Sequence, residues 1–186
     1  MTTSQNNHQP DFPAAALEAA ASTRLLAIDV DGVLTDGGIY IGELGELFKR
    51  FHSQDGLGIR LLQRADVYVS IITGRSSPIV LQRAAELGVG SVIQGCKNKR
   101  QALEQLAAER GVDANAVAFA GDDLPDIPAM NFSGFAVAVA NAHDSVKSNA
   151  DWITTRSGGN GAIRELCDLI LVAQNKYEIV VDEYSG

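Results

Sequence analysis

Residues 24–35 read Arg-Leu-Leu-Ala-Ile-Asp-Val-Asp-Gly-Val-Leu-Thr, and this stretch decides the fold that the sequence predicts. Its first part is a continuous apolar run, which is typical of a strand covered on both faces of a parallel sheet. The run ends at two acids, Asp29 and Asp31. Ligands bind at the carboxyl ends of the strands in such sheets, so this pair of acids is a candidate for chemistry.

Strand-like and helical segments alternate around this stretch. Gly88 and Gly111 each follow an expected helix, where a left-handed residue often ends the last turn. Repeated strand–helix units predict a Rossmann-like, three-layer α/β/α fold with a mostly parallel sheet. Further strands are expected at 67–73, 91–93, 117–120, 135–139 and 151–153, and helices at 14–21, 56–64, 78–87, 98–110 and 162–173, with a short helix after Asp123.

A different segment, residues 38–51, interrupts the alternation. Two β-prone runs flank a turn that contains Gly45, which predicts a β-hairpin flap. The chain has no longer insert, so it has no room for a cap domain. The expected organisation is a tail and lead-in over residues 1–21, one catalytic domain over 22–175 that includes the hairpin, and a C-terminal tail over 176–186.

The composition argues against several classes of function. The net charge of −8 disfavours a nucleic-acid partner, because a phosphate backbone attracts clustered Lys and Arg. No apolar stretch is long enough to cross a bilayer, so no membrane partner is expected. The polar start lacks the apolar core of a secretory signal, and the distant Cys96 and Cys167 match no metal spacing. These features favour a cytoplasmic protein with reduced thiols.

Polar groups also follow two other expected strands. Thr73-Gly74-Arg75 follows one, and Gly121-Asp122-Asp123 follows another, with Asp126 close behind. All of these groups converge on one edge if the sheet is parallel. Carboxylates that share a crevice repel one another unless a cation neutralises them, and Mg²⁺ prefers oxygen ligands. Asp29 and Asp122 are therefore the natural side-chain ligands of a magnesium ion.

The two acids after the first strand are expected to have different roles. We expect Asp31 to point away from Asp29 and to offer the metal its main-chain carbonyl. The Asp31 carboxylate is then available as general acid and base, while Asp29 attacks phosphorus as a nucleophile. Thr73 and a lysine would stabilise the phosphoryl oxygens. Lys99, at the start of a helix, and Lys97 are both candidates for that lysine.

Each motif alone has an ordinary structural explanation. An isolated Asp-x-Asp is most often a turn, and Asp122-Asp123 could simply cap a helix. Residues 158–161 (Gly-Gly-Asn-Gly) match no phosphate-loop spacing, so a flexible turn is favoured over an anion site. Arg60 and Arg83 read as surface groups on helices. Only the whole set, at the ends of separate strands, favours catalysis over chance.

These residues resemble the four motifs of the haloacid dehalogenase superfamily of phosphohydrolases, over residues 24–173. The resemblance implies a magnesium-dependent phosphomonoesterase in which Asp29 is the nucleophile and Asp31 the acid and base. It also selects Lys99 over Lys97. The metal-site residues that it implies are Asp29, Asp31 and Asp122, with Asp123 and Asp126 in support.

A narrower resemblance, to the capless branch of that superfamily, lies in residues 36–40, 51–60 and 158–165. It implies an eight-carbon sugar acid phosphate from lipopolysaccharide synthesis as substrate, or a related nine-carbon one. It also implies a homotetramer whose hairpins meet centrally, so that a neighbouring subunit helps to close each site. The substrate contacts that it implies are His52, Ser53, Gln54, Asp55, Gly56, Arg60, Arg75, Arg83 and Lys99.

One departure and two alternatives stay open. Relatives often carry a basic residue where Asn160 stands, which weakens the choice of substrate and not the catalytic motifs. A phospho-signalling receiver also gathers acids, Thr and Lys at a sheet edge. Its phosphorylated aspartate, however, follows a middle strand, whereas Asp29 follows the first. A non-catalytic binding protein on the same fold is the other alternative, and fold alone does not refute it.

Overall fold

The apolar run after Arg24 forms β1, a central strand of a six-stranded sheet in which each neighbouring pair is parallel. These strands belong to a computed structural model that describes residues 9–184. Leu25, Leu26 and Ile28 are fully buried, because helices cover both faces of the sheet. The spatial order is β5 (Ser91–Ile93), β4 (Tyr68–Ile72), β1 (Leu25–Ile28), β6 (Val117–Gly121), β7 (Phe135–Ala138) and β8 (Trp152–Ile153).

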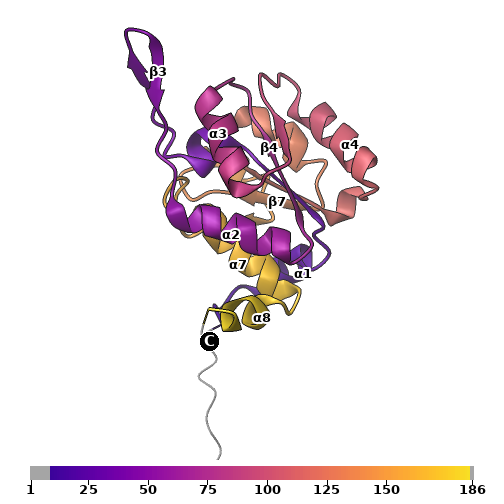
Figure 1. The fold of residues 1–186 in the computed structure, drawn as a ribbon. Coiled ribbons are helices and arrows are strands. Elements are labelled where there is room, and N and C mark those ends of the chain that lie inside the picture. Colours follow the sequence, from indigo (N-terminus) through magenta and orange to yellow (C-terminus); the bar gives the residue numbers. More distant parts are fainter. Residues whose placement is uncertain (1–8, 185–186) are drawn as a thin grey trace, which may run out of the picture.

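Helices lie on both sides of the sheet (Figure 1). On one side α2 packs on α7, and α7 on α1, while α4 packs on α5 on the other side. The helices are α1 (Ala14–Ala20), α2 (Ser53–Arg64), α3 (Pro78–Leu87), α4 (Lys99–Arg110), α5 (Ile127–Met130), α6 (Asp144–Lys147), α7 (Ala162–Ala173) and α8 (Tyr177–Asp182). The structure therefore confirms the three-layer α/β/α fold.

The hairpin consists of β2 (Tyr40–Gly42) and β3 (Gly45–Phe48), which pair antiparallel and project away from the α/β body (Figure 1). Tyr40 stacks on Phe48 with their ring centroids 4.2 Å apart. Large apolar side chains along the hairpin are nevertheless exposed: Ile39, Ile41, Leu44, Leu47 and Phe48. The hairpin flap is thus present, and it places an apolar surface in solvent.

Two short helices were not anticipated from the sequence. One is α6, and the other is α8, which lies within the segment assigned to a C-terminal tail. Val180 anchors α8 because its side chain is buried. The division of the chain into a domain and two tails stays a prediction, and residues 1–8 and 185–186 of those tails lie outside the described residues. No helix within residues 9–184 is long and apolar enough to cross a membrane.

Candidate active site

The acidic motifs meet where the strand order reverses. After β1 the chain moves outward through β4 and β5, and it then returns to β6 on the other side of β1. In open α/β sheets a ligand crevice forms at this point, outside the carboxyl ends of the strands. The structure has a cavity of about 450 Å³ there, lined by Asp29, Asp31, Thr73, Gly74, Arg75, Cys96, Lys97, Lys99, Asp122, Asp123, Pro125 and Asp126.

Three carboxylates and one lysine form the buried centre of this cavity. Oxygen atoms of Asp29, Asp122 and Asp126 all lie within 4.8 Å of one another. The ammonium of Lys99 lies 2.8 Å from Asp29 Oδ1 and 2.5 Å from Asp126 Oδ1, and only 6% of its side chain is exposed. Lys97 is exposed on the cavity wall instead. Lys99 therefore neutralises part of the acidic cluster from within.

Burial and the neighbouring charges shift the pKa values of the residues in this cluster. Burial, with repulsion from Asp126, raises the pKa of Asp29 to about 6. Burial and the charges of Asp29 and Asp126 raise the pKa of Asp122 to about 7. Burial alone would lower the pKa of Lys99, but the carboxylates of Asp29 and Asp126 outweigh it and raise that pKa. One lysine does not balance three buried acids.

The donor set fits a magnesium ion. Asp122 Oδ1 is buried and accepts no hydrogen bond from the described residues, so its lone pairs are available to a cation. Asp29 and Asp122 supply the one or two carboxylates by which Mg²⁺ is usually held in phosphoryl-transfer sites. Hard oxygen donors suit Mg²⁺ better than softer metals. A cation here would offset the repulsion that raises both pKa values.

Asp126 shapes the turn that carries Asp122. Its Oδ2 accepts the backbone N–H of Asp122 at 3.0 Å and of Asp123 at 3.1 Å, while its Oδ1 binds Lys99. The Asp123 side chain accepts the N–H of Leu124 at 2.8 Å. Asp123 and Asp126 also form a capping box, in which the side chain of each accepts the backbone N–H of the other. Asp126 is 1% exposed, so it orders this turn from inside the protein.

The loop after β1 brings its backbone very close to the acids. Gly32 has φ +94°, a left-handed conformation that favours glycine. A Cβ at Gly32 would lie 2.0 Å from Asp122 Oδ2, so a side chain there would displace this carboxylate. The N–H of Thr35 bonds to the carbonyl of Val30 at 3.0 Å and closes the turn. The glycine of the first motif therefore allows Asp29 and Asp122 to approach.

The segment 158–161 packs on that same loop. A Cβ at Gly158 would lie 1.8 Å from Gly32 O, and one at Gly159 would lie 2.3 Å from Asp36 N. Asn141 links the two segments, since its Oδ1 accepts the N–H of Gly158 at 2.6 Å and its Nδ2 donates to Gly32 O at 3.2 Å. The glycines thus permit close backbone packing, which differs from the flexible turn that the sequence favoured.

Asp31 and Asp29 point to different partners. Asp29 contacts Lys99, whereas the Asp31 carboxylate forms an ion pair with Lys49 and lies 3.7 Å from the Nε of Arg75. Sequence reasoning missed Lys49, whose side chain is 2% exposed. One feature of the sequence could have indicated Lys49. The second strand of a hairpin runs back toward the residues that precede the first strand. A basic residue at its end therefore comes back to Asp31.

Thr73 also lies at this edge, directly after β4. Its side chain is buried and lines the cavity with Asp29 and Lys99. Its backbone N–H bonds to Ile93 O at 2.9 Å, and its carbonyl accepts the N–H of Cys96 at 3.0 Å. Both cysteines, Cys96 and Cys167, are free thiols.

Most of the expected substrate contacts lie outside the catalytic cavity of a single chain. His52, Asp55, Gly56 and Arg83 line a small cavity of about 10 Å³ between α2 and α3. Asp55 is 1% exposed, and its Oδ1 accepts the N–H of Arg164 at 2.8 Å, which ties α2 to the start of α7. Their role as substrate contacts stays a prediction.

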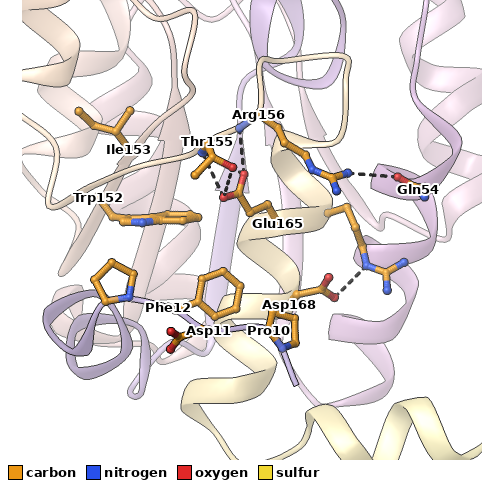
Figure 2. A pocket seen from close by; sticks show the side chains of 12 residues that line it. Pro10, Asp11, Phe12, Gln54, Trp152, Ile153, Thr155, Arg156, Glu165 and Asp168 are labelled. Carbon is orange, nitrogen blue, oxygen red and sulfur yellow. Dashed lines mark hydrogen bonds and ion pairs between the residues drawn. The ribbon is translucent and has the colours of Figure 1, made fainter. Parts of the chain in front are cut away.

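The other three expected substrate contacts outside the catalytic cavity are Arg60, Ser53 and Gln54, and each has different surroundings. Arg60 donates to the carbonyl of Glu86 at 3.2 Å, and Ser53 is exposed at the start of α2. Gln54 lines a separate cavity of about 660 Å³ beside Trp152 and Phe12 (Figure 2). There Gln54 accepts a hydrogen bond from Arg156 at 3.3 Å. Arg75 and Lys99 are thus the expected substrate contacts that one chain brings to the catalytic cavity.

The fold and this cavity define a Rossmann-like α/β protein with a carboxylate centre suited to phosphoryl transfer, and comparisons with known proteins agree. A sequence model described as haloacid dehalogenase-like hydrolase matches residues 88–166. With that match and the relatives described next, the chain belongs to the haloacid dehalogenase-like hydrolase family.

Within that family the similarity is narrower. The chain is 46% identical to the 3-deoxy-D-manno-octulosonate 8-phosphate phosphatase of Escherichia coli K12 over 167 residues, which is 90% of this chain and 87% of that protein. The Yersinia pestis phosphatase of the same name is also 46% identical, over 162 residues and 87% of each chain.

Solved structures give the same relationship. The 3-deoxy-D-manno-octulosonate 8-phosphate phosphatase of Moraxella catarrhalis, solved with magnesium, phosphate and the KDO molecule, has a TM-score of 0.89 at 42% identity. The alignment covers 91% of this chain and 97% of that one. The cobalt-bound phosphatase of Haemophilus influenzae has a TM-score of 0.87 at 39% identity, over 90% and 99% of the chains. These relatives favour an enzyme over a receiver or a binding module.

Proposed function

We propose that the chain is a Mg²⁺-dependent phosphomonoesterase that hydrolyses 3-deoxy-D-manno-octulosonate 8-phosphate to the free sugar acid and phosphate, in lipopolysaccharide biosynthesis. The observation that carries this proposal is the meeting of Asp29, Asp122 and Lys99 in one cavity at the switch point of the sheet. The high similarity to phosphatases of that name supports the substrate. A related nine-carbon sugar acid phosphate is the alternative.

The proposed reaction has two steps. A carboxylate oxygen of Asp29 attacks phosphorus, the bond to the sugar oxygen breaks, and Asp31 gives that oxygen a proton. Asp31 then takes a proton from a water molecule that attacks the aspartyl-phosphate, which releases phosphate and frees Asp29. Thr73 and Lys99 donate hydrogen bonds to the phosphoryl oxygens. At the end of the cycle phosphorus again has four oxygen neighbours in the released phosphate, and Asp31 again carries its proton.

The metal site would be formed by the carboxylates of Asp29 and Asp122 and the carbonyl of Asp31, with Asp123 and Asp126 in support. Bound Mg²⁺ supplies electrostatic stabilisation of the transferring phosphoryl group. Lys99 keeps Asp29 oriented, since it holds both Asp29 and Asp126. Arg75, which lines the cavity and is 44% exposed, would contact the sugar acid.

We also propose that the enzyme is a homotetramer whose hairpins meet. Ile41, Leu44 and Leu47 are exposed by 70%, 105% and 63%, and apolar surface of this kind marks an interface. A neighbouring subunit would bring further substrate contacts to each site, among the expected residues that lie outside the cavity. The free thiols of Cys96 and Cys167 support a cytoplasmic location.

The experiment that tests the proposal measures phosphate release. We expect activity that EDTA abolishes, that Mg²⁺ restores, and that Asp29→Asn removes while the circular dichroism spectrum stays unchanged. Full activity of Asp29→Asn would contradict the covalent mechanism.

Comparison of kcat/KM on the eight- and nine-carbon sugar acid phosphates then tests the substrate. We expect the eight-carbon compound to be preferred. A preference for the nine-carbon compound would replace the substrate and keep the reaction class.

A further inference from the structure

Four charged side chains form a closed ring at the base of the hairpin. Lys49 pairs with the carboxylate of Asp31 and lies 3.0 Å from Glu46 Oε1. Arg75 closes the ring, at 3.6 Å from Glu46 Oε1 and 3.7 Å from Asp31 Oδ2. The charges alternate in sign around it. The ring connects three segments that are distant in sequence: the loop after β1, the hairpin and the loop after β4.

The burial of Lys49 distinguishes its ion pairs from an ordinary pair on the surface. The side chain of Lys49 is 2% exposed, and those of Glu46 and Asp31 are 17% and 19% exposed. Exposed ion pairs contribute little, but a buried ammonium needs opposite charges to offset its lost hydration. Glu46 is itself anchored, because Ser77 donates its hydroxyl hydrogen to the other carboxylate oxygen. Lys49 is therefore held in place from two sides.

The ring has a specific consequence for Asp31. Lys49 engages Oδ1, whereas Arg75 lies 3.7 Å from Oδ2, which is beyond hydrogen-bond distance. Oδ2 is thus the oxygen left for proton exchange with another group in the cavity. A carboxylate that is held at one oxygen has its rotamer fixed, and proton transfer depends on that geometry.

We propose that Lys49 is a positioning residue for Asp31, that Glu46 holds Lys49 in place for this task, and that the hairpin thereby supplies part of the catalytic arrangement. The inference rests on the proposed function, in which Asp31 protonates the leaving oxygen. It differs from a role of Lys49 as a direct ligand of the substrate carboxylate, and the two roles separate experimentally.

The test uses kcat/KM of the full-length enzyme with Mg²⁺ on three substrates. The sugar acid 8-phosphate has an alkoxide leaving group and a carboxylate, and glycerol 3-phosphate has an alkoxide leaving group without a carboxylate. The third, p-nitrophenyl phosphate, has a leaving group stable enough to depart without a proton. The variants are Lys49→Met and Glu46→Gln. Their matched controls are Lys147→Met on α6 and Glu109→Gln, an exposed glutamate near the end of α4.

We expect Lys49→Met to lower kcat/KM for both alkyl phosphates by about 10- to 100-fold, as part of the contribution of a general acid, and for p-nitrophenyl phosphate by less than about 3-fold. Glu46→Gln should show the same pattern to a smaller degree, and the controls should match wild type. A loss confined to the sugar acid phosphate would assign Lys49 to the substrate carboxylate and overturn the proposal. Equal effects on all three substrates would also overturn it.

A wild-type enzyme that ignores the sugar acid but hydrolyses the other two compounds would refute the proposed substrate, while those two compounds still test Lys49. Hydrogen exchange gives a second, activity-free test. Because the ring holds the hairpin against the body, Lys49→Met should speed amide exchange across residues 40–48, and Glu109→Gln should not. Unchanged exchange in Lys49→Met would show that the ring does not hold the hairpin.

Discussion

The buried carboxylates of Asp29 and Asp122 make the stability of the metal-free protein depend on pH. Their pKa values are raised, to about 6 and about 7, from an ordinary value of 3.8, mainly by burial. The folded state therefore binds protons that the unfolded chain has lost. The resulting stability is fully present below pH 3.8 and disappears as the pH rises through about 6 and about 7.

We therefore predict that the melting temperature of metal-free protein falls between about pH 5 and pH 8, and that Mg²⁺ raises it more at pH 8 than at pH 5. The cation binds the ionised carboxylates, so Mg²⁺ raises the melting temperature most where both carboxylates have lost their protons. Differential scanning fluorimetry with EDTA or Mg²⁺ measures both trends. Asp122→Asn is the control and should flatten them. A Mg²⁺ effect that is equal at the two pH values would contradict this account.

Single residues also mark where sequence reasoning succeeded and where it stopped. Asp29, Thr73 and Asp122 could be brought together from sequence, because each directly follows a strand whose carboxyl end must lie at one edge. Lys99 begins a helix, and only the family resemblance selected it over Lys97. Lys49 could not be placed there from sequence, since its neighbours depend on how the hairpin folds back onto the body. Local pattern carries no information about that docking.

At the scale of elements, the loop after β1 depends on the segment that precedes α7. Gly158 and Gly32 touch backbone to backbone, and this contact holds the loop that carries Asp29 and Asp31. Strand and helix patterns predicted both elements but not their contact. Residues 158–161 were interpreted as a flexible turn, because the run of glycines does not reveal which backbone packs against it.

We predict that Gly158→Ala destabilises the fold by at least about 1–3 kcal/mol and lowers kcat strongly, because the added methyl group would lie 1.8 Å from Gly32 O. Backbone on both sides leaves little room for relaxation. The matched control is Gly90→Ala, whose Cβ would meet Tyr68 Oη at 3.8 Å, an ordinary contact. Urea denaturation and steady-state kinetics measure the two effects. Wild-type kinetics in Gly158→Ala would show that the contact does not support the loop.

The regular elements themselves were largely predictable. The helices Pro78–Leu87 and Ala162–Ala173 and the strand Ser91–Ile93 have the bounds that the sequence predicted. Gly88 ends its helix with φ +71°, as the C-cap pattern required. The helix Tyr177–Asp182 was missed because its stability comes from the burial of Val180 against the rest of the fold, and a six-residue segment has little helical preference of its own.

At the scale of the whole molecule, alternation of strands and helices predicted the layers, and the reversal of strand order explains why the site lies between β1 and β6. The spatial order of the strands could not be predicted from the sequence. That order depends on which strand edges are free when each strand–helix unit docks. The sequence also predicted the hairpin, but not the direction in which the hairpin projects. The structure shows the hairpin projecting from the body with its apolar residues exposed (Figure 1).

We predict that Ile41→Glu combined with Leu47→Glu converts the proposed tetramer into smaller species. Charges placed on an apolar interface lose hydration without gaining partners, so association weakens. Size-exclusion chromatography with light scattering measures the mass. Ile179→Glu is the control, because Ile179 is exposed on α8, which lies at the end of the molecule opposite to the hairpin (Figure 1). A wild-type protein that is already monomeric would contradict the interface.

In the proposed tetramer the hairpin would also link association to catalysis, because the exposed Leu47 and the buried Lys49 are only two residues apart on the chain. A partner that covers Leu47 would steady the end of β3, beyond which Lys49 meets Asp31. Mass action then makes specific activity a function of enzyme concentration. Assays over a wide dilution series should show activity per molecule falling as subunits separate, with a lag after rapid dilution that reports the rate of dissociation. Under this scheme the activity per molecule is highest where the enzyme itself is most concentrated. Total turnover would therefore rise more steeply than in proportion to the expression level.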